Sequence, residues 1–190
     1  PQLRQESDIP ILGVVEPACR RAAAVTRNRR VGLIATAASV RSGAYQRSLR
    51  QLDPDIAVTA KACPLFVPLV ENGRFRRGDV VIETVAREYL EPLRREGLDT
   101  LILGCTHYPL LTDIIGDIMG PGVTLINTGE EAAWELKRTL RGLDLLAPEG
   151  PAGRATLCAS DQPEQFGVMA SYFLGESLTR PVQPVDIDRY

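Results

Sequence analysis

The sequence predicts a doubly wound α/β fold, in which a mainly parallel β-sheet is flanked by helices. The first observation is that short apolar runs alternate along the chain with longer amphipathic stretches. The second is that these runs are continuous rather than alternating, which is typical of strands buried on both faces of a parallel sheet. The third is that 44% hydrophobic residues in a chain of 190 can bury a sizeable core.

Each element is assigned from its own pattern. The apolar runs predict strands at 9–15, 31–36, 56–60, 100–103 and 123–126. The amphipathic segments predict helices at 16–26, 39–52, 79–95, 109–119 and 130–140. Pro92 lies inside the third of these helices and is expected to kink it or end it early, because proline removes a backbone N–H.

Composition shifts divide the chain into four parts. We expect a polar lead-in at 1–8, an α/β domain at 9–141, a Gly/Pro/Ala-rich linker at 142–153 and a C-terminal part at 154–190. The last part is expected to contain one strand (155–159) and one helix (164–174). Two elements are too few to bury a core, so they are expected to pack on the main sheet or on a partner domain.

Charge and cysteine usage exclude several classes of protein. The net charge is −2 and the 22 basic residues are scattered, so we expect no nucleic-acid partner. No apolar run reaches the roughly 18 residues of a membrane span, and the polar start is not a signal peptide, so we expect no membrane partner. The four cysteines, Cys19, Cys63, Cys105 and Cys158, have no metal-ligand spacing. They are expected to be free thiols in a reducing cytoplasm, with no metal.

The segment richest in reactive side chains follows the strand expected at 100–103. It reads Leu-Gly-Cys-Thr-His-Tyr-Pro-Leu and contains Cys105, Thr106 and the only histidine of the chain, His107. Ligands of open α/β sheets bind at the carboxyl ends of the strands. Pro109 suits the start of a helix, whose N-terminus favours an anion and is expected to lower the pKa of the thiol or to hold a carboxylate.

Simpler and rival interpretations exist for this segment. In the purely structural interpretation, Cys105 is a buried cysteine at the end of a strand and His107 caps the following helix. A Cys–His hydrolase or a thiol transferase would use the same residue types, although a papain-like nucleophile takes its histidine from a distant part of the sequence.

Other strand ends carry weaker signals. Asn127 is expected to cap a helix, and Thr36 and Ser39 are expected either to cap a helix or to line the same site. Trp134 is expected in the core or at an interface.

The stretch Leu-Gly-Cys-Thr-His-Tyr-Pro-Leu-Leu at 103–111 resembles the C-terminal active-site signature of glutamate racemases, in the aspartate/glutamate racemase superfamily. Agreeing segments are Ala-Cys-Pro-Leu-Phe-Val-Pro-Leu-Val-Glu at 62–71, Gly-Val-Val-Glu-Pro at 13–17 and Ser-Gly-Ala-Tyr at 42–45. The resemblance runs from about residue 9 to 174. It implies two α/β domains facing each other, one cysteine from each, and stereoinversion at Cα without pyridoxal phosphate, any other cofactor or metal.

The resemblance also implies a role for each residue of the site. Cys105 would be the acid or base on one face of glutamate, the face used with the L-enantiomer. Thr106 and His107 would bind the substrate, and His107 would assist proton transfer at Cys105. Glu71 would orient or charge-balance His107; a solvated loop carboxylate is its alternative interpretation. The whole protein would be a bacterial, cytoplasmic isomerase that supplies D-glutamate for peptidoglycan and cell-wall biogenesis, and a homodimer is within the family's range.

One half of the family pattern is missing. The Cys-Asn-Thr motif with the opposing cysteine does not occur in this sequence, and Cys19, Cys63 and Cys158 are not convincing replacements, Cys63 being expected in the core. We therefore expect a chain that lacks the N-terminal half-domain, a C-terminal part (154–190) that belongs to that domain, and no complete two-base reaction by this chain alone. Two alternatives stay open: a related racemase or isomerase for aspartate, hydantoin or maleate, and a catalytically incomplete binding or regulatory remnant.

Overall fold

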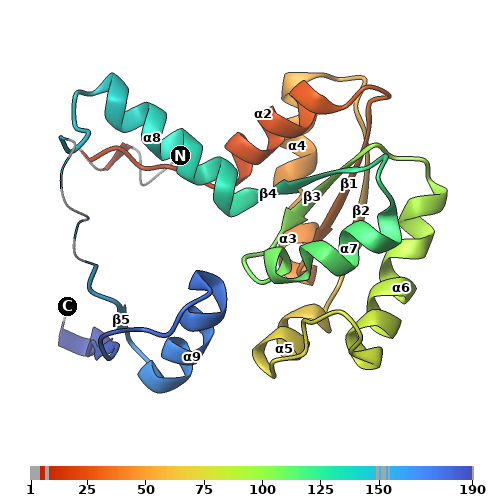
Figure 1. Cartoon of the computed structure of the whole chain (residues 1–190). Helices are drawn as coiled ribbons and strands as arrows, with labels where there is room; N and C mark the ends of the chain where they lie inside the picture. Colours follow the sequence, from red (N-terminus) through yellow and green to blue (C-terminus); the bar gives the residue numbers. More distant parts are fainter. Residues whose placement is uncertain (1–4, 7–8, 149, 151–152, 154, 190) are drawn as a thin grey trace. The chain divides into compact units, whose positions relative to one another are not determined.

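The computed structural model describes residues 5–6, 9–148, 150, 153 and 155–189, and the chain divides into two compact units, residues 1–146 and 147–190 (Figure 1). Most of the lead-in expected at 1–8 lies outside the described residues. The first unit holds a parallel sheet in the order β2-β1-β3-β4. Its strands are β1 (Arg30–Ala35), β2 (Ala57–Ala62), β3 (Thr100–Gly104) and β4 (Thr124–Asn127). The predicted parallel α/β sheet is confirmed.

Helices flank this sheet, as Figure 1 shows for the first unit. The helix α2 contacts α4 and α8 as well as β3 and β4, whereas α6 contacts α7. The bounds are α2 (Val15–Val25), α3 (Ala37–Ser42), α4 (Ala44–Leu52), α5 (Phe66–Glu71), α6 (Val80–Arg95), the 3-10 helix η1 (Tyr108–Leu111), α7 (Thr112–Met119) and α8 (Thr128–Gly142). None of the helices in the described part of the chain combines the length and the apolar character that a membrane crossing requires.

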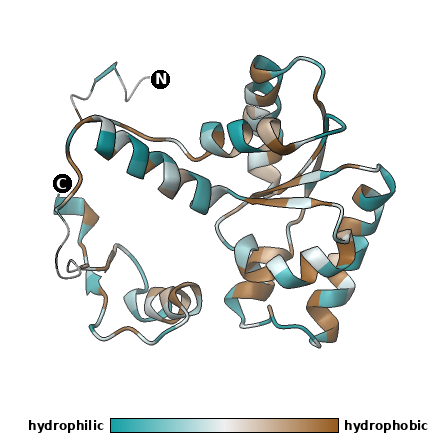
Figure 2. Cartoon of the chain, turned by 45° about the horizontal axis from the view of Figure 1, so that its top comes forward, coloured by the Kyte–Doolittle hydropathy of each residue, from teal (hydrophilic) through white to brown (hydrophobic). Residues whose placement is uncertain are grey.

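The core of this unit is built on the central strands β1 and β3. Every residue of β3 is buried, and so is every residue of β1 after Arg30. Figure 2 shows hydrophobic residues along these strands and on the helix faces turned toward them. Gly104 ends β3 in crowded surroundings: a Cβ there would lie 2.9 Å from Leu33 Cδ1 and 3.1 Å from the carbonyl oxygen of Ile34.

A buried carboxylate stabilises the opposite end of β3. Asp99 is 8% exposed. It accepts hydrogen bonds from Thr26 Oγ1 (2.7 Å), Arg27 N (2.7 Å), Asn28 N (2.9 Å) and Thr100 Oγ1 (2.9 Å). Burial raises the pKa of Asp99, but these four donors outweigh it and hold the pKa below the ordinary aspartate value. The loop after α2 is therefore fastened to the start of β3.

The strand predicted at 9–15 is wrong. Residues 9–14 form no helix or strand, and Val15 already begins α2. Ile9 is 75% exposed and Val14 is 52% exposed. Pro10 cannot donate a ladder hydrogen bond, and an apolar run becomes a strand only where a neighbouring strand accepts it.

Three predicted helices differ from the prediction in how they begin, continue or are divided. The segment expected at 39–52 is divided by Gly43, which has φ 64° and joins α3 to α4. The segment expected at 109–119 begins as the 3-10 helix η1. The helix α6 continues through Pro92 to Arg95, so the expected early end is wrong. Pro92 lies on the exposed side of α6, where water can satisfy the carbonyl group that loses its partner.

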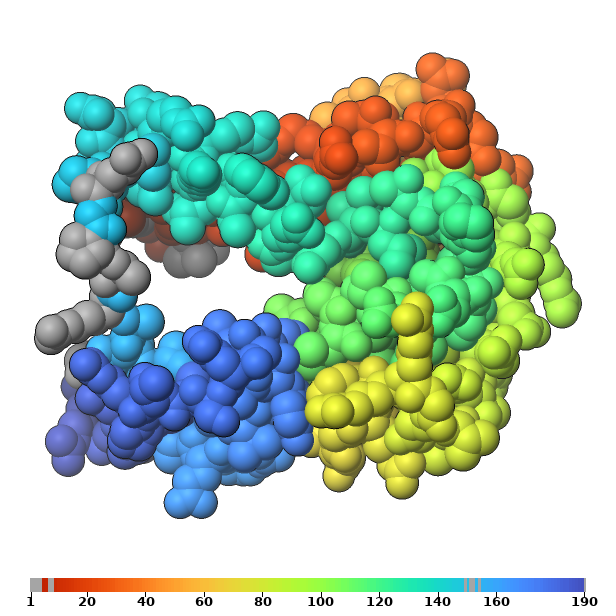
Figure 3. All heavy atoms as spheres, viewed as in Figure 1, coloured from red at the N-terminus to blue at the C-terminus, as the bar shows by residue number. Residues whose placement is uncertain are grey.

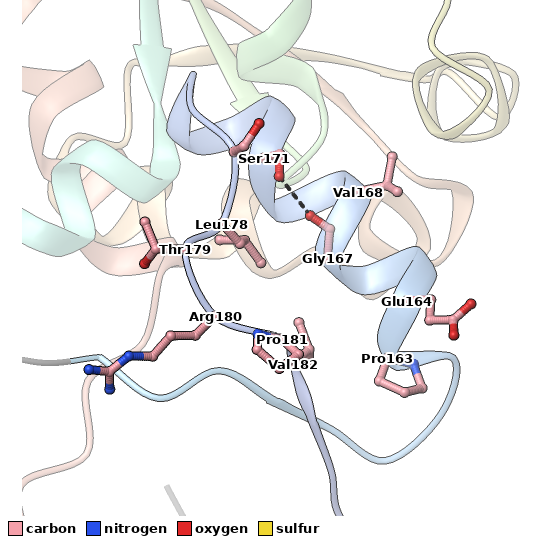
Figure 4. Close-up of a pocket in the computed structure, with 11 residues that line it drawn as sticks. Pro163, Glu164, Gly167, Val168, Ser171, Leu178, Thr179, Arg180, Pro181 and Val182 are labelled. Carbon is pink, nitrogen blue, oxygen red and sulfur yellow. Dashed lines mark hydrogen bonds between the residues drawn. The ribbon is translucent and has the colours of Figure 1, made fainter.

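The second unit is a small parallel pair of strands beside one helix. It contains β5 (Cys158–Ala159), α9 (Pro163–Leu174), β6 (Gln183–Pro184) and the 3-10 helix η2 (Ile187–Arg189). The strand expected at 155–159 is thus shorter than predicted, and residue 154 lies outside the described residues. Figure 4 shows a pocket between α9 and the segment 177–182, beside a Ser171 hydroxyl that donates to the carbonyl of Gly167 at 3.0 Å.

Gly104→Ala is expected to destabilise the protein by about 1–3 kcal/mol, because the added methyl group meets backbone as well as side chains. Urea unfolding followed by circular dichroism measures this free energy. Gly122→Ala is the matched control, since a Cβ at Gly122 meets nothing within 4 Å. Equal stabilities of the two variants would contradict the close approach at Gly104.

Asp99→Asn is expected to lower the free energy of unfolding by about 2 kcal/mol at neutral pH, the loss typical of hydrogen bonds to a charged group. A carboxylate whose folded-state pKa is lowered stabilises the protein above the unfolded value of about 4. That contribution is lost as the pH falls through the folded-state pKa. The difference between wild type and variant is therefore expected to shrink below about pH 4 in unfolding titrations, and the exposed Asp161→Asn serves as the control. A pH-independent difference would contradict the assignment.

Candidate active site

The strand order β2-β1-β3-β4 defines where a ligand binds. The chain leaves β1 for β2 on one side and returns to β3 on the other side of β1. At such a switch point the loops after the two central strands diverge and leave a crevice at their carboxyl ends. Thr36 follows β1 and Cys105 follows β3, and the preceding residues Ala35 and Gly104 are paired in the sheet. Cys105 therefore stands at the edge of the sheet where ligands of this fold bind.

Four side chains predicted from the sequence meet at this edge. The Sγ atom of Cys105 lies 4.0 Å from Nδ1 of His107, and the Thr106 hydroxyl lies 3.2 Å from the same nitrogen. The other ring nitrogen of His107, Nε2, lies 3.1 Å from Oε1 of Glu71. His107 is largely shielded, with 21% of its side chain exposed, and Glu71 is 41% exposed. The four residues form one network of polar contacts centred on His107, with Glu71 on one ring nitrogen and Cys105 and Thr106 on the other.

The partner of Nε2 determines the tautomer of His107. An ionised carboxylate can only accept a hydrogen bond, so its partner nitrogen carries the proton. With Nε2 donating to Glu71, a neutral imidazole presents the lone pair of Nδ1 to Cys105 and Thr106. Nδ1 can then accept a proton from the thiol, which is the orientation that proton transfer needs.

The pKa of the Cys105 thiol is raised, and the lowering expected from a helix N-terminus is wrong. Burial is the largest effect and raises the pKa. Hydrogen bonds from the His107 and Thr106 backbones and the Thr106 hydroxyl lower it by less, and the charge of Glu71 raises it further. Cys105 is therefore a protonated thiol at neutral pH.

Glu71 reaches the site from a different part of the chain. It is the last residue of α5, a short helix that was not predicted from the sequence, in a segment that contains Pro64 and Pro68. Pro68 lies in the first turn of α5, where its missing N–H costs nothing. Figure 3 shows the segment of α5 (yellow) against the segment after β3 (green), and α5 contacts η1. Tertiary packing brings together residues that are 36 positions apart.

The other cysteines lie in different surroundings. Cys63 is buried, as expected, and burial raises the pKa of its thiol to about 12. Cys19 is also buried and donates to the carbonyl of Tyr45 at 3.7 Å, whereas Cys158 is exposed in the second unit. Within the described residues, no group of three or more His, Cys, Asp or Glu side chains could hold a metal ion.

The polar residues that follow β1 and β4 cap the next helices. Thr36 accepts a hydrogen bond from the backbone of Ser39 at 3.3 Å and caps α3. Asn127 caps α8 by accepting from the backbones of Gly129 and Glu130. The side chain of Trp134 is 55% exposed, so a position in the core is wrong.

Comparison with known proteins agrees with this geometry. A family model described as Asp/Glu/hydantoin racemase matches residues 1–136. The chain belongs to this racemase family. It is 46% identical over 176 residues to a glutamate racemase from Geobacter metallireducens, covering 93% of this chain and 64% of that protein. It is 45% identical over 184 residues to a glutamate racemase from Mycobacterium ulcerans, covering 95% of this chain and 67% of that protein. The chain thus spans about two thirds of the length of these relatives.

Solved racemase structures show the same fold. A glutamate racemase isoform from Bacillus anthracis matches with a TM-score of 0.88 at 34% identity, covering 98% of this chain and 68% of that one. The glutamate racemase from Thermus thermophilus, solved with β-chloro-D-alanine, matches with a TM-score of 0.84 at 44% identity, covering 100% of this chain and 68% of that one.

The raised pKa of Cys105 makes its alkylation a test of the site. We expect iodoacetamide to label the exposed Cys158 first at pH 7, with Cys19 and Cys63 protected by burial. Labelling of Cys105 is expected to accelerate with a midpoint above the ordinary cysteine value of about 8.5, because only the thiolate reacts. Peptide mass spectrometry across pH measures all four rates. Faster labelling of Cys105 than of Cys158 at pH 7 would indicate a stabilised thiolate and contradict the assignment.

Proposed function

We propose that this chain provides one side of a cofactor-independent, two-base glutamate racemase, with Cys105 as the acid and base on one face of the substrate. The observation that carries the proposal is the arrangement of Cys105, His107 and Glu71 at the carboxyl end of β3. Thr106 and His107 are proposed to contact the substrate as well, because they flank the reactive thiol.

The chemistry explains why such a site needs a shielded thiol. The Cα proton of an amino acid is a very weak acid, so its base must be strong and held at contact distance. A thiolate in partly buried surroundings is a stronger base than one in water, because burial raises the pKa of Cys105. In one direction the Cys105 thiol delivers its proton to the planar Cα carbanion and becomes a thiolate. In the reverse direction the Cys105 thiol first passes its proton to His107 Nδ1, and the thiolate so formed then removes the Cα proton and becomes a thiol again.

The substrate is proposed from the relatives. Both relatives described above are named glutamate racemases. The glutamate racemase of Francisella tularensis was crystallised with D-glutamate, and that of Escherichia coli with L-glutamate and an activator. We propose glutamate as the substrate here, the L-enantiomer as the one that reacts at Cys105, and D-glutamate for peptidoglycan as the product of the whole protein. A reducing bacterial cytoplasm suits this chemistry, which needs a free thiol.

Inversion requires a second acid and base on the opposite face of Cα. Cys63 and Cys19 are buried, Cys63 at the end of β2 and Cys19 on α2, which leaves neither as that group. We propose that the opposing thiol comes from the part of the relatives that has no counterpart in this sequence. We propose further that residues 154–190 pack on that same part, because no residue of α9 is buried and Phe166, Phe173 and Leu174 are exposed.

Exchange of the Cα proton in deuterated water tests the proposal. Glutamate incubated with the 190-residue chain is expected to exchange slowly, because one thiol serves one face only. Cys105→Ala is expected to abolish the exchange, and His107→Asn to slow it about 100-fold, the scale of general acid–base catalysis. Cys158→Ala is the matched control and is expected to exchange at the wild-type rate.

Two outcomes contradict parts of this proposal. Racemisation by this chain at the rate of a complete enzyme would show that the opposing acid and base is present within these 190 residues. Complete absence of exchange, with retained binding of glutamate, would favour the catalytically incomplete binding or regulatory protein. Mass spectrometry of the recovered glutamate and chiral chromatography separate these outcomes.

A further inference from the structure

The carbonyl group of Cys63 joins the two segments that carry the proton relay. It accepts a hydrogen bond from the Tyr108 hydroxyl at 3.0 Å and a second from the backbone N–H of Phe66 at 3.3 Å. Tyr108 follows His107 directly, and Phe66 begins the helix α5 that ends at Glu71. A single acceptor therefore fastens the loop of the histidine to the helix of its carboxylate partner.

The aromatic rings reinforce this connection. The ring of Tyr108 meets the ring of Phe66 edge to face, with centroids 5.2 Å apart and an interplanar angle of 89°. Phe66 meets Tyr89 of α6 in the same manner at 5.3 Å. Tyr108 and Phe66 are both fully buried. Edge-to-face pairs have a preferred geometry, so they restrict rotation of α5 as well as filling space.

We propose that Tyr108 is a positioning residue for the proton relay: its hydroxyl, through the carbonyl of Cys63, holds α5 at the angle that keeps Glu71 on Nε2 of His107. The catalytic meaning of this role rests on the proposed function. Burial raises the pKa of Tyr108 far above its ordinary value, so its hydroxyl stays a donor at any working pH.

The length of α5 explains why one hydrogen bond matters. Phe66 and Glu71 are separated along the helix axis by about 7.5 Å, so a tilt of roughly 10° about the first turn displaces Glu71 by about 1.3 Å. That displacement is enough to break the 3.1 Å contact between Glu71 Oε1 and His107 Nε2. Nε2 would then lose the partner that fixes its proton, and Nδ1 would no longer be held as an acceptor toward Cys105.

The single histidine of this chain makes the proposal measurable without substrate. Diethyl pyrocarbonate modifies imidazole nitrogens whose lone pair is accessible, and the ultraviolet absorbance of the product reports His107 alone. Tyr108→Phe keeps the ring on Phe66 and removes only the hydroxyl. We expect the modification rate to rise about fivefold, which corresponds to the loss of one hydrogen bond of about 1 kcal/mol.

Thr128→Val is the matched control. The Thr128 hydroxyl donates a buried hydrogen bond to the carbonyl of Leu103 in β3 at 3.1 Å, two residues before Cys105. Its removal costs stability of the same order but leaves the connection between α5 and Tyr108 in place. We expect the His107 modification rate of this variant to stay within about twofold of wild type.

A double-mutant cycle identifies the route of the effect. Glu71→Ala removes the carboxylate itself and is expected to raise the modification rate of His107 at least as much as Tyr108→Phe. Because Tyr108 is proposed to act through Glu71, the variant carrying both changes is expected to match Glu71→Ala alone. Independent action would instead multiply the two effects.

Three results would overturn the proposal: an unchanged modification rate in Tyr108→Phe, an equal rise in Thr128→Val, or multiplying effects in the double variant. If circular dichroism shows that Tyr108→Phe is unfolded, Phe66→Leu replaces it, because it removes the ring contact and keeps the hydroxyl; its expected rise in rate is of the same order. Every measurement omits glutamate, so a failure of the proposed racemisation is seen separately, as absent Cα exchange with an intact His107 response.

Discussion

The parallel pairing of β1 with β3 is the constraint on which the candidate site depends. Every residue of β3 and every residue of β1 after Arg30 is buried, and Gly104 pairs with Ala35 where a Cβ would crowd Leu33 and the Ile34 carbonyl oxygen. This pairing puts the loops after both strands at the switch point of the sheet, where they diverge. Cys105 follows Gly104 immediately, so the register of β1 and β3 also determines where the thiol stands.

The protonation state of Cys105 follows from the burial of its thiol, not from stabilisation of the thiolate by nearby donors. Burial outweighs the nearby N–H and O–H donors and raises the pKa of Cys105, so the resting group is a thiol. The contact of Glu71 with His107 presents Nδ1 toward that thiol. A protonated acid beside an accepting imidazole suits a reaction in which protons are delivered and removed at carbon, and it differs from the activated thiolate of a cysteine nucleophile.

The sequence predicted the strands of the sheet correctly, but it mispredicted the segment at 9–15 and gave no prediction for helix α5. Continuous apolar runs such as Leu101–Leu103 correctly indicated strands buried on both faces. The run at 9–15 is also mostly apolar, but it contains Pro10 and Gly13, pairs with no strand among the described residues and stays at the surface. Helix α5 was not predicted from the sequence, and its one proline, Pro68, occupies a first turn that tolerates it. The hydrophobicity of a segment and its proline content indicate only its local conformational preference. Whether the segment pairs as a strand or packs as a helix depends on the elements that surround it in the fold.

By itself, the sequence determined the fold class, the racemase signature around Cys105 and the identity of the four side chains in the site. Only the tertiary structure decided that Glu71 lies on Nε2 of His107, that the thiol stays protonated, and that Tyr108 ties α5 to the loop of the histidine. The physical reason is that hydrogen-bond distances and desolvation depend on atoms far apart in the chain. A motif records residue types and spacing, but the angle of α5 and the burial of Cys105 arise only when the sheet and its helices have packed.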